Sequence, residues 1–508
     1  MAKRARAPAA LLALLMAPAA HAEVKFTPSI GASETYSDNV GQQTAQFAQS
    51  SFITELTPGF NVVSNGPRLK LLGSYQLHLY SYSEKTNNTN NSSSNYQLSM
   101  QAKLIDQLLD LDASAVRQST SLSAFGPQGN DSLYSNNNRS DVSTYTIAPT
   151  LRHRFGGTAD AYLRYSHNRV VGDSLLGTTS GDTISANIAS GQNFRTIGWG
   201  LSATQDSFSG DRYGDTESQN VEGSLRYRVS NSLSLTATAG YDKYDYASQS
   251  SEATQGKSYT GGFVWTPSSR TRLQMSYGRR YYGNTGNMAF TFRSHRSALN
   301  ASYTDNVTTS RQQFLGSSAL STNALLDAML TASIPDPIER AKAIAAYIAA
   351  TGITPSITNN TNYLNNVFQR LRSLQVGYSL QGAHSTSTVS VYKTRTEALS
   401  TQQADSDLFG QNLASLNNNL DSTGATISYL QRMTSATQAL ASINYQHSKT
   451  IDTDLTTDTK SVRLGLTHTF SPKLRGSAEI RQQRGSYYNI GSSRYRENAI
   501  SATILMQF

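Results

Sequence analysis

The sequence predicts an all-β fold: a transmembrane, antiparallel, up-and-down β-barrel of about 22 strands (roughly 20 to 24), with a short helical insert in one external loop. Three observations support this prediction. Apolar and polar residues alternate along repeated segments, short and long connections alternate between the segments, and only 15% of the 508 residues are charged. Soluble globular proteins carry about 25% charged residues. No segment has the roughly 18 consecutive apolar residues that a membrane helix needs, which excludes a bundle of membrane helices.

The N-terminal segment, residues 1–22, predicts a secretory signal peptide. A basic region (Lys3 to Arg6) is followed by an apolar stretch (Ala9 to Ala17) and by the small-x-small cleavage site Ala20-His21-Ala22. The apolar stretch is too short to span a membrane. We expect cleavage after Ala22, which lowers the formal charge from +9 to +6 because Lys3, Arg4 and Arg6 are removed. Residues 23–508 would then form the barrel in the outer membrane of a Gram-negative bacterium.

The strands are predicted from an alternation with a period of two residues. Leu69, Leu71, Leu77 and Leu79 occupy every second position of one segment, with mainly polar residues such as Lys70 between them. Because successive side chains point to opposite faces of a strand, this pattern indicates one apolar and one polar face. The pattern recurs along the whole chain, for example in 233–241, 273–277, 462–470 and 500–508. Each run is close to the about 9–11 residues that a tilted strand needs to cross a bilayer.

The connections between these segments indicate which end of the barrel is which. Turn-forming residues join strand pairs at one end, where Gly and Asn allow positive φ and Pro fixes φ. Long polar links join them at the other end, as external loops do in outer-membrane barrels. The turns are Asn65-Gly66, Gly156-Gly157, Ser230-Asn231, Pro267-Ser268, Gly382-Ala383 and Ser471-Pro472, and examples of the long links are 83–95, 119–140, 397–421 and 484–496. A soluble β-sandwich or solenoid is the alternative, but its surface should carry more charge.

One external connection, residues 311–366, has helical character. Asp336-Pro337 places a capping residue before a Pro at the first helical position, and Gly352 follows an apolar stripe that begins at Ile338. A second, shorter helix is expected near 323–332. The insert is either an ordered surface loop or a segment that folds into the mouth and constricts the barrel.

The polar faces of the strands carry the candidate functional residues. Their basic excess could attract anions such as acidic polysaccharide or phosphate, and their tyrosines could stack on sugar rings. Equally, the arginines could pair with acids and stiffen the barrel wall. The predicted lumen-facing bases are Arg152, Arg154, Arg164, Arg226, Arg228, Arg272, Arg280, Arg463, Arg475 and Arg481. The possible sugar-stacking residues are Tyr80, Tyr162, Tyr282 and Tyr392. A pI of 9.4 does not by itself predict nucleic-acid binding.

No motif for catalysis or cofactor binding is found. The chain has no cysteine, which excludes disulfides, thiol catalysis and cysteine-ligated metals. Its histidines are dispersed, and the G-x-G-x-x-A letters at 198–203 lie inside a predicted strand rather than before a helix. We therefore expect no enzyme activity, cofactor or metal, although a dispersed Ser/His/Asp set in an outer-membrane hydrolase is an open alternative. The alternating C-terminal strand ends on Met506 and Phe508, which fits the signal that barrel-assembly machinery recognises.

Five segments carry a family resemblance. They are 240–246 (GYDKYDY), 265–271 (WTPSSRT), 277–285 (YGRRYYGNT), 308–314 (TTSRQQF) and 495–499 (YRENA). The chain resembles the PEP-CTERM system-associated outer-membrane protein family over nearly all of residues 23–508, with TTSRQQF as the most specific segment. The resemblance implies a Gram-negative bacterium with an exosortase system, whose genes often lie beside exopolysaccharide loci. It carries over no catalytic residue.

Taken together, these observations favour a channel or accessory for exopolysaccharide or envelope-polymer export. Two alternatives stay open: a general or anion-preferring diffusion porin, and a non-conducting scaffold for surface proteins or biofilm matrix. The expected partners are outer-membrane lipids, the barrel-assembly machinery and an anionic polysaccharide, with no nucleic acid. The sequence does not predict an oligomeric state.

Overall fold

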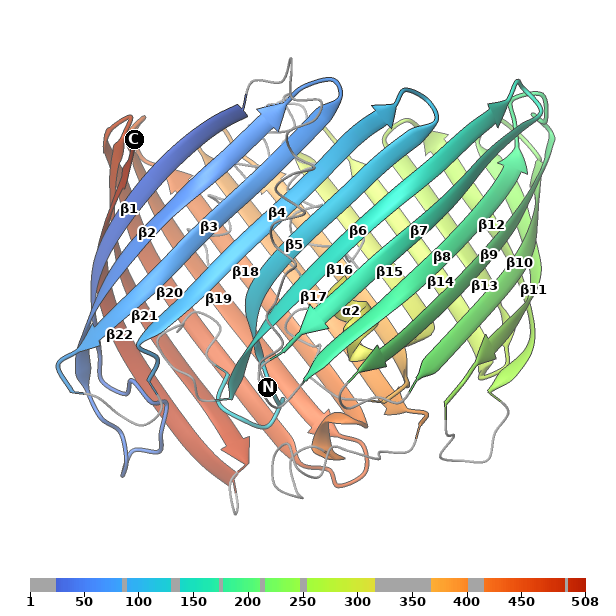
Figure 1. The fold of residues 1–508 in the computed structure, drawn as a ribbon. Coiled ribbons are helices and arrows are strands. Elements are labelled where there is room, and N and C mark those ends of the chain that lie inside the picture. The colour runs from blue at the N-terminus through green and yellow to red at the C-terminus, as the bar shows by residue number, and fades with distance from the viewer. Residues whose placement is uncertain are drawn as a thin grey trace, which may run out of the picture.

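The computed structural model is a closed barrel of 22 antiparallel strands (Figure 1), which confirms the predicted fold class. Each strand pairs with its neighbours in sequence, and β1 (Val24–Ser37) pairs with β22 (Ser492–Gln507) to close the barrel. The structure describes residues 24–84, 89–128, 138–172, 177–210, 215–246, 254–315, 367–400, 415–488 and 492–508. The predicted signal peptide, and the predicted helices at 323–332 and 336–352, lie outside these residues.

The remaining elements follow in chain order. They are β2 (Ser51–Asn65), β3 (Leu69–Tyr82), β4 (Ser92–Ile105), β5 (Leu109–Ser121), β6 (Arg139–Phe155), β7 (Ala159–Val171), β8 (Thr178–Ser190), β9 (Ile197–Gly210), β10 (Thr216–Arg228), β11 (Leu233–Tyr244), β12 (Gln255–Ser268), β13 (Thr271–Arg280), β14 (Gly283–Arg293), β15 (Ser297–Thr308), α2 (Ser310–Leu315), β16 (Gln369–Gln381), β17 (Ser385–Ala398), η4 (Ser415–Asn417), β18 (Leu420–Arg432), β19 (Thr437–Thr450), β20 (Thr456–Ser471) and β21 (Leu474–Tyr488). No helix among the described residues is long and apolar enough to cross a membrane.

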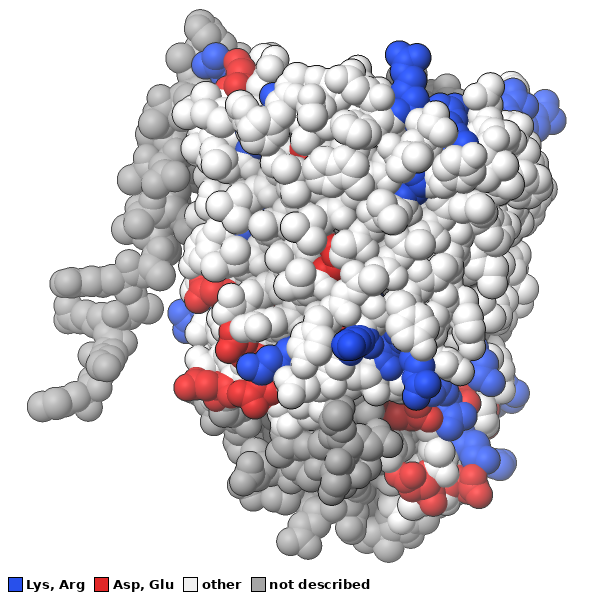
Figure 2. Space-filling view, turned by 90° about the vertical axis from the view of Figure 1, so that its right-hand side faces the viewer, with Lys and Arg blue, Asp and Glu red and all other residues white. Residues whose placement is uncertain are grey.

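The alternation in the sequence becomes the two faces of the wall. In β19, Ile443 and Tyr445 are exposed on the outside, whereas Ser442 and Ser448 are buried toward the lumen. The same arrangement repeats around the barrel. The face drawn in Figure 2 is a wide uncharged band with Lys, Arg, Asp and Glu gathered mainly near its two edges. This band is the lipid-facing belt of an outer-membrane type barrel.

The two ends of the barrel differ in their connections. Each even-numbered strand from β2 to β20 joins the next odd-numbered strand through a short turn, at what we call the turn end (Figure 1, top). Most longer connections lie at the opposite, loop end. Outer-membrane barrels place short turns in the periplasm and long loops outside, and we use this orientation below.

One predicted external loop is wrong in extent. Residues 484–496 are mostly strand, because β21 and β22 continue as a hairpin that pairs as far as Tyr488 and Ser492. β13 and β14 are joined at the loop end by Tyr281 and Tyr282 alone, and Gly283 has a φ of 106°. Polar composition suggested a loop at 484–496, but backbone pairing can continue along polar residues beyond the lipid-facing belt.

Candidate functional site

The register places all ten predicted arginines on the lumen side of the wall. Six of them form ion pairs with lumen-facing carboxylates, as the wall-stiffening alternative expected. The N–O distances are 2.9 Å for Arg152–Asp110, 2.8 Å for Arg154–Asp160, 2.6 Å for Arg164–Asp112, 3.0 and 3.3 Å for Arg280 with Asp242 and Glu222, 3.1 Å for Arg463–Glu479 and 3.1 Å for Arg481–Glu497. Arg152, Arg154, Arg463 and Arg481 pair with a neighbouring strand, whereas Arg164 and Arg280 reach carboxylates across intervening strands. The paired arginines therefore add little net charge to the lumen wall.

The other four form what we call the turn-end arginine group: Arg226, Arg228, Arg272 and Arg475. Among the described residues, none of the four has a carboxylate oxygen within 4 Å. All four are exposed, and each lies within three residues of a strand terminus at the turn end. Arg228 Nη2 donates to Asn231 Oδ1 at 3.2 Å, and Arg272 Nη2 donates to Gln274 Oε1 at 3.4 Å. The unpaired positive charge of the lumen therefore gathers at one mouth.

The four candidate tyrosines differ in access. Tyr80 and Tyr392 are buried, and Tyr80 is stacked on His78 with ring centroids 6.2 Å apart. Tyr282 lies in the β13–β14 turn rather than in a strand, and the guanidinium of Arg370 covers its ring at 5.0 Å. Tyr162 keeps 41% of its surface exposed, and the register places it opposite Arg152 in the lumen. Of these four, it has the most accessible ring for a passing sugar.

The segment after β15 turns into the barrel as α2, which packs against β6 and β7 (Figure 1). Its start is a capping box: Gln312 N donates to Thr309 Oγ1 (3.2 Å), and Gln312 Oε1 accepts from Thr309 N (3.0 Å). Gln312 Nε2 also donates to Asp206 on β9 (3.1 Å). Arg311 is almost fully buried, with its guanidinium 4.8 Å from the ring centre of Phe208 and 3.8 Å from Asp206. The segment TTSRQQF thus fixes α2 to the distant wall.

A polar cavity of about 440 Å³ lies between α2 and the wall. Its lining is rich in hydroxyl and amide groups from β6 to β10, such as Thr146, Asn168 and Asn220. The charged groups on its wall include Arg164, Asp206 and Arg311, each within 4 Å of an opposite charge. The size falls within the range of small-molecule sites, and the lining suits uncharged, hydroxyl-rich groups.

Two further loop-end segments fold into the lumen. The β5–β6 connection reaches β21 and β22, where Gln128 accepts from Gln483 Nε2 and its backbone N donates to the hydroxyl of Tyr495 at 3.3 Å. The β1–β2 connection buries Val40 against Ile53 and Tyr80. Together with α2, these segments occupy part of the loop end of the barrel. The predicted constriction by the 311–366 insert concerns mainly residues outside the described part of the chain.

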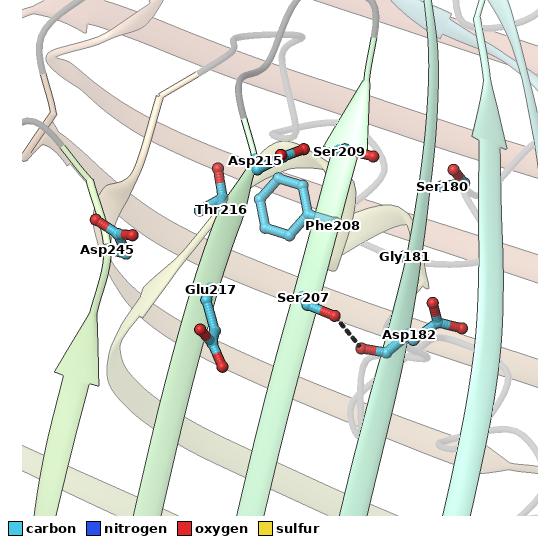
Figure 3. Close-up of a pocket in the computed structure, with 10 residues that line it drawn as sticks. All are labelled: Ser180, Gly181, Asp182, Ser207, Phe208, Ser209, Asp215, Thr216, Glu217 and Asp245. Atoms are coloured by element: carbon cyan, nitrogen blue, oxygen red, sulfur yellow. Dashed lines mark hydrogen bonds between the residues drawn. The ribbon is translucent and has the colours of Figure 1, made fainter.

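A second cavity of about 350 Å³ lies at the loop ends of β8 to β11 (Figure 3). Four carboxylates line it: Asp182, Asp215, Glu217 and Asp245. Two of them have neutral or histidine donors, since Gln219 Nε2 donates to Glu217 (2.8 Å) and Asp182 contacts His167 Nδ1 (2.9 Å). Among the described residues, no three His, Asp or Glu side chains are placed to hold a metal ion.

Sequence reasoning missed the inward anchor at Arg311. The residue lies in the quoted segment TTSRQQF, but its partners Asp206 and Phe208 are about a hundred residues earlier, so local spacing gave no signal. The one available signal was Thr309 three residues before Gln312, which is a helix-start pattern.

No protein-family model matches the chain, and no curated protein matches it. Among solved structures it is similar to the FrpB iron transporter from Neisseria meningitidis (F5-1 variant), with a TM-score of 0.49, 9% identity, and coverage of 95% of this chain and 82% of that one. For the siderophore receptor PiuA from Acinetobacter baumannii the values are 0.47, 9%, 95% and 82%. For a loop-deletion mutant of OmpT, an outer membrane protein of Vibrio cholerae, they are 0.33, 8%, 96% and 99%. At such identities the likeness concerns the barrel fold alone.

Proposed function

We propose that this outer-membrane β-barrel serves the PEP-CTERM/exosortase system as a channel or accessory for the export of exopolysaccharide or another envelope polymer. The observation that carries the proposal is the distribution of lumen charge. The paired arginines, which include Arg152 and Arg154 near the turn end, add little net charge to the lumen, whereas the unpaired cations of the turn-end arginine group all lie at one mouth. A polymer leaving the cell enters a barrel from the periplasm, where the short turns of outer-membrane barrels lie.

The turn-end arginine group would draw an anionic polymer toward that mouth. Clustered like charges in a low-dielectric cleft raise the local concentration of counter-ions, and this attraction weakens as salt increases. Beyond the mouth, hydroxyl and amide groups can exchange hydrogen bonds with a sliding sugar chain without holding it tightly. The resemblance in 240–246, 265–271, 277–285 and 308–314 supports the link to exosortase and exopolysaccharide.

Planar-bilayer recordings of the refolded protein test the electrostatic part. The variant R226Q/R228Q/R272Q/R475Q removes four unpaired charges and should shift ion selectivity toward cations. The control R463Q/E479Q removes a 3.1 Å ion pair without changing the net charge, so its selectivity should stay that of the wild type. Unchanged selectivity in the fourfold variant would contradict an anion path through this mouth.

A gene deletion tests the export role. Loss of secreted polysaccharide with intact small-solute uptake supports export, and restoration by the wild type but not by the fourfold variant ties export to the turn-end arginine group. Reduced small-solute uptake with normal polysaccharide would instead indicate a diffusion porin.

The inward-folded loop-end segments favour a second candidate, a non-conducting scaffold for surface proteins or biofilm matrix. Arg311 and Gln128 each connect a loop to a distant part of the wall. The scaffold function is supported over the channel function if the wild type shows no ion conductance and deletion of its gene changes the retention of surface proteins without changing polysaccharide secretion.

A further inference from the structure

Three cations stand together on the outer surface near the loop end. They are Lys243 on β11, Lys257 on β12 and Arg279 on β13, which we call the loop-end cation group, and all three are exposed. Lys257 is paired with Tyr241, Arg279 with Tyr259, and Lys243 with Gln255. Residues that are directly opposite share a face of the sheet. The register therefore makes the three cations diagonal neighbours, about 7–8 Å apart at the backbone from one to the next.

The tyrosines beside these cations indicate where the cations lie relative to the membrane. Tyr241, Tyr259 and Tyr277 point outward with 45%, 57% and 60% of their surface exposed, and exposed Leu235 and Met275 lie on the same face farther toward the turn end. Outward tyrosines mark the interface between hydrocarbon and headgroups in outer-membrane barrels. The cations thus lie at headgroup level, where Lys and Arg are seen along the lower edge of the uncharged band (Figure 2).

Three other outward-facing cations at the same end have acidic partners. Lys393 lies 3.8 Å from Asp421, Lys449 lies 2.6 Å from Asp454, and Arg117 lies 2.8 Å from Asp141. In contrast, no carboxylate oxygen of the described residues lies within 4 Å of the loop-end cation group. The nearest acids by register, Glu217 and Asp245, lie on the Lys243 side of the group and line the cavity at the loop ends of β8 to β11 (Figure 3).

We propose that the loop-end cation group binds the phosphate of a phosphorylated glycolipid of the outer leaflet. Lys and Arg are the phosphate-binding side chains, and acyl chains of the same lipid would lie on the apolar belt next to Tyr259. Juxtamembrane Lys and Arg bind anionic lipid with about 1 kcal/mol each, which is about a fivefold change in affinity per cation. This inference does not depend on what the barrel transports.

The test measures lipid binding to the full-length mature barrel in detergent micelles containing EDTA, by native mass spectrometry. The probes are a bisphosphorylated lipid A, the same lipid without phosphates, and inorganic phosphate. The variant K243Q/K257Q/R279Q should bind the bisphosphorylated lipid on the order of a hundredfold more weakly than the wild type. The matched control R270Q/R296Q/K473Q removes three exposed cations from turns at the opposite end, and it should bind like the wild type.

Four outcomes overturn the proposal. They are equal losses in the two triple variants, equal binding of the phosphorylated and unphosphorylated lipids, displacement of the lipid by inorganic phosphate at equal concentration, and no loss in the cation variant. Heat-modifiable migration on gels shows whether each variant is folded. If the triple variant fails to fold, the single variant K257Q and a salt titration of the wild type apply the same criteria, with about fivefold weaker binding expected for K257Q.

Discussion

Arg481→Leu removes the cation from a buried ion pair beside the seam that closes the barrel. Glu497 on β22 is 1% exposed, and its carboxylate accepts from Arg481 Nη2 (3.1 Å), Ser37 Oγ (2.9 Å) and Gln42 Nε2 (3.1 Å). The cluster therefore joins β21, β22, β1 and the β1–β2 connection. Loss of Arg481 leaves a buried carboxylate that is solvated by neutral donors.

The expected cost follows from the burial. Removing one partner of a buried pair typically costs about 3–5 kcal/mol, and we expect about 3 kcal/mol because Ser37 and Gln42 continue to donate. The double variant R481L/E497L removes both charges, so it should lose less stability than either single variant. Such non-additivity is the signature of a direct interaction.

Urea unfolding of the protein in lipid vesicles, followed by the fluorescence of Trp199 and Trp265, measures this change as a shift in the midpoint at constant slope. Arg154→Leu is the control, because its pair with Asp160 is largely exposed and exposed pairs contribute about 0–1 kcal/mol. The reasoning is refuted if R481L costs no more than R154L, or if the double variant is less stable than both single variants.

Three further predictions concern α2 and the wall. Arg311→Ala should raise single-channel conductance, because the cation–π contact that it removes stabilises the inward position of α2 by about 1–2 kcal/mol. Unchanged conductance would mean that α2 does not narrow the ion path. Thr309→Val removes the helix cap, at a cost of about 1 kcal/mol, and should speed hydrogen exchange in α2 without moving the urea midpoint of the barrel. Gly278→Val should destabilise the barrel by about 1–3 kcal/mol, because a Cβ at this position would clash with the Tyr259 carbonyl oxygen. Gly261→Ala is the control: its Cβ meets nothing within 4 Å, so the urea midpoint should not change.

The wall of the barrel could be predicted because the direction of each side chain depends on its position along its own strand. A period of two residues sets which side chains meet lipid, and a slip of one residue would turn every apolar side chain inward. The alternation around Leu69 and Ile500 therefore predicted both that these segments are strands and which of their side chains face lipid. Where the pattern becomes polar, as in 484–496, the same reasoning failed, because strand pairing beyond the membrane needs no apolar face.

The interior could not be predicted because its contacts are not local. Arg164 on β7 pairs with Asp112 on β5, across an intervening strand, and only the three-dimensional register brings the two side chains together. Gln128 and Tyr495 are 367 residues apart in sequence. Lumen-facing parity identified the charged residues, but it could not separate paired arginines from those of the turn-end arginine group.

The paired arginines and the turn-end arginine group have different physical roles in the barrel. Paired arginines such as Arg280 and Arg481 cancel their partners' fields, so they add cohesion between strands and little attraction for a distant ion. Unpaired arginines at the turn end add little cohesion, because nothing opposite holds them, and their field extends into solvent. Neutralising the turn-end arginine group should therefore change selectivity at constant stability, and removing both partners of an ion pair should change stability at constant selectivity. If the charges served only solubility, the two sets of variants would not differ in their effects on selectivity and stability.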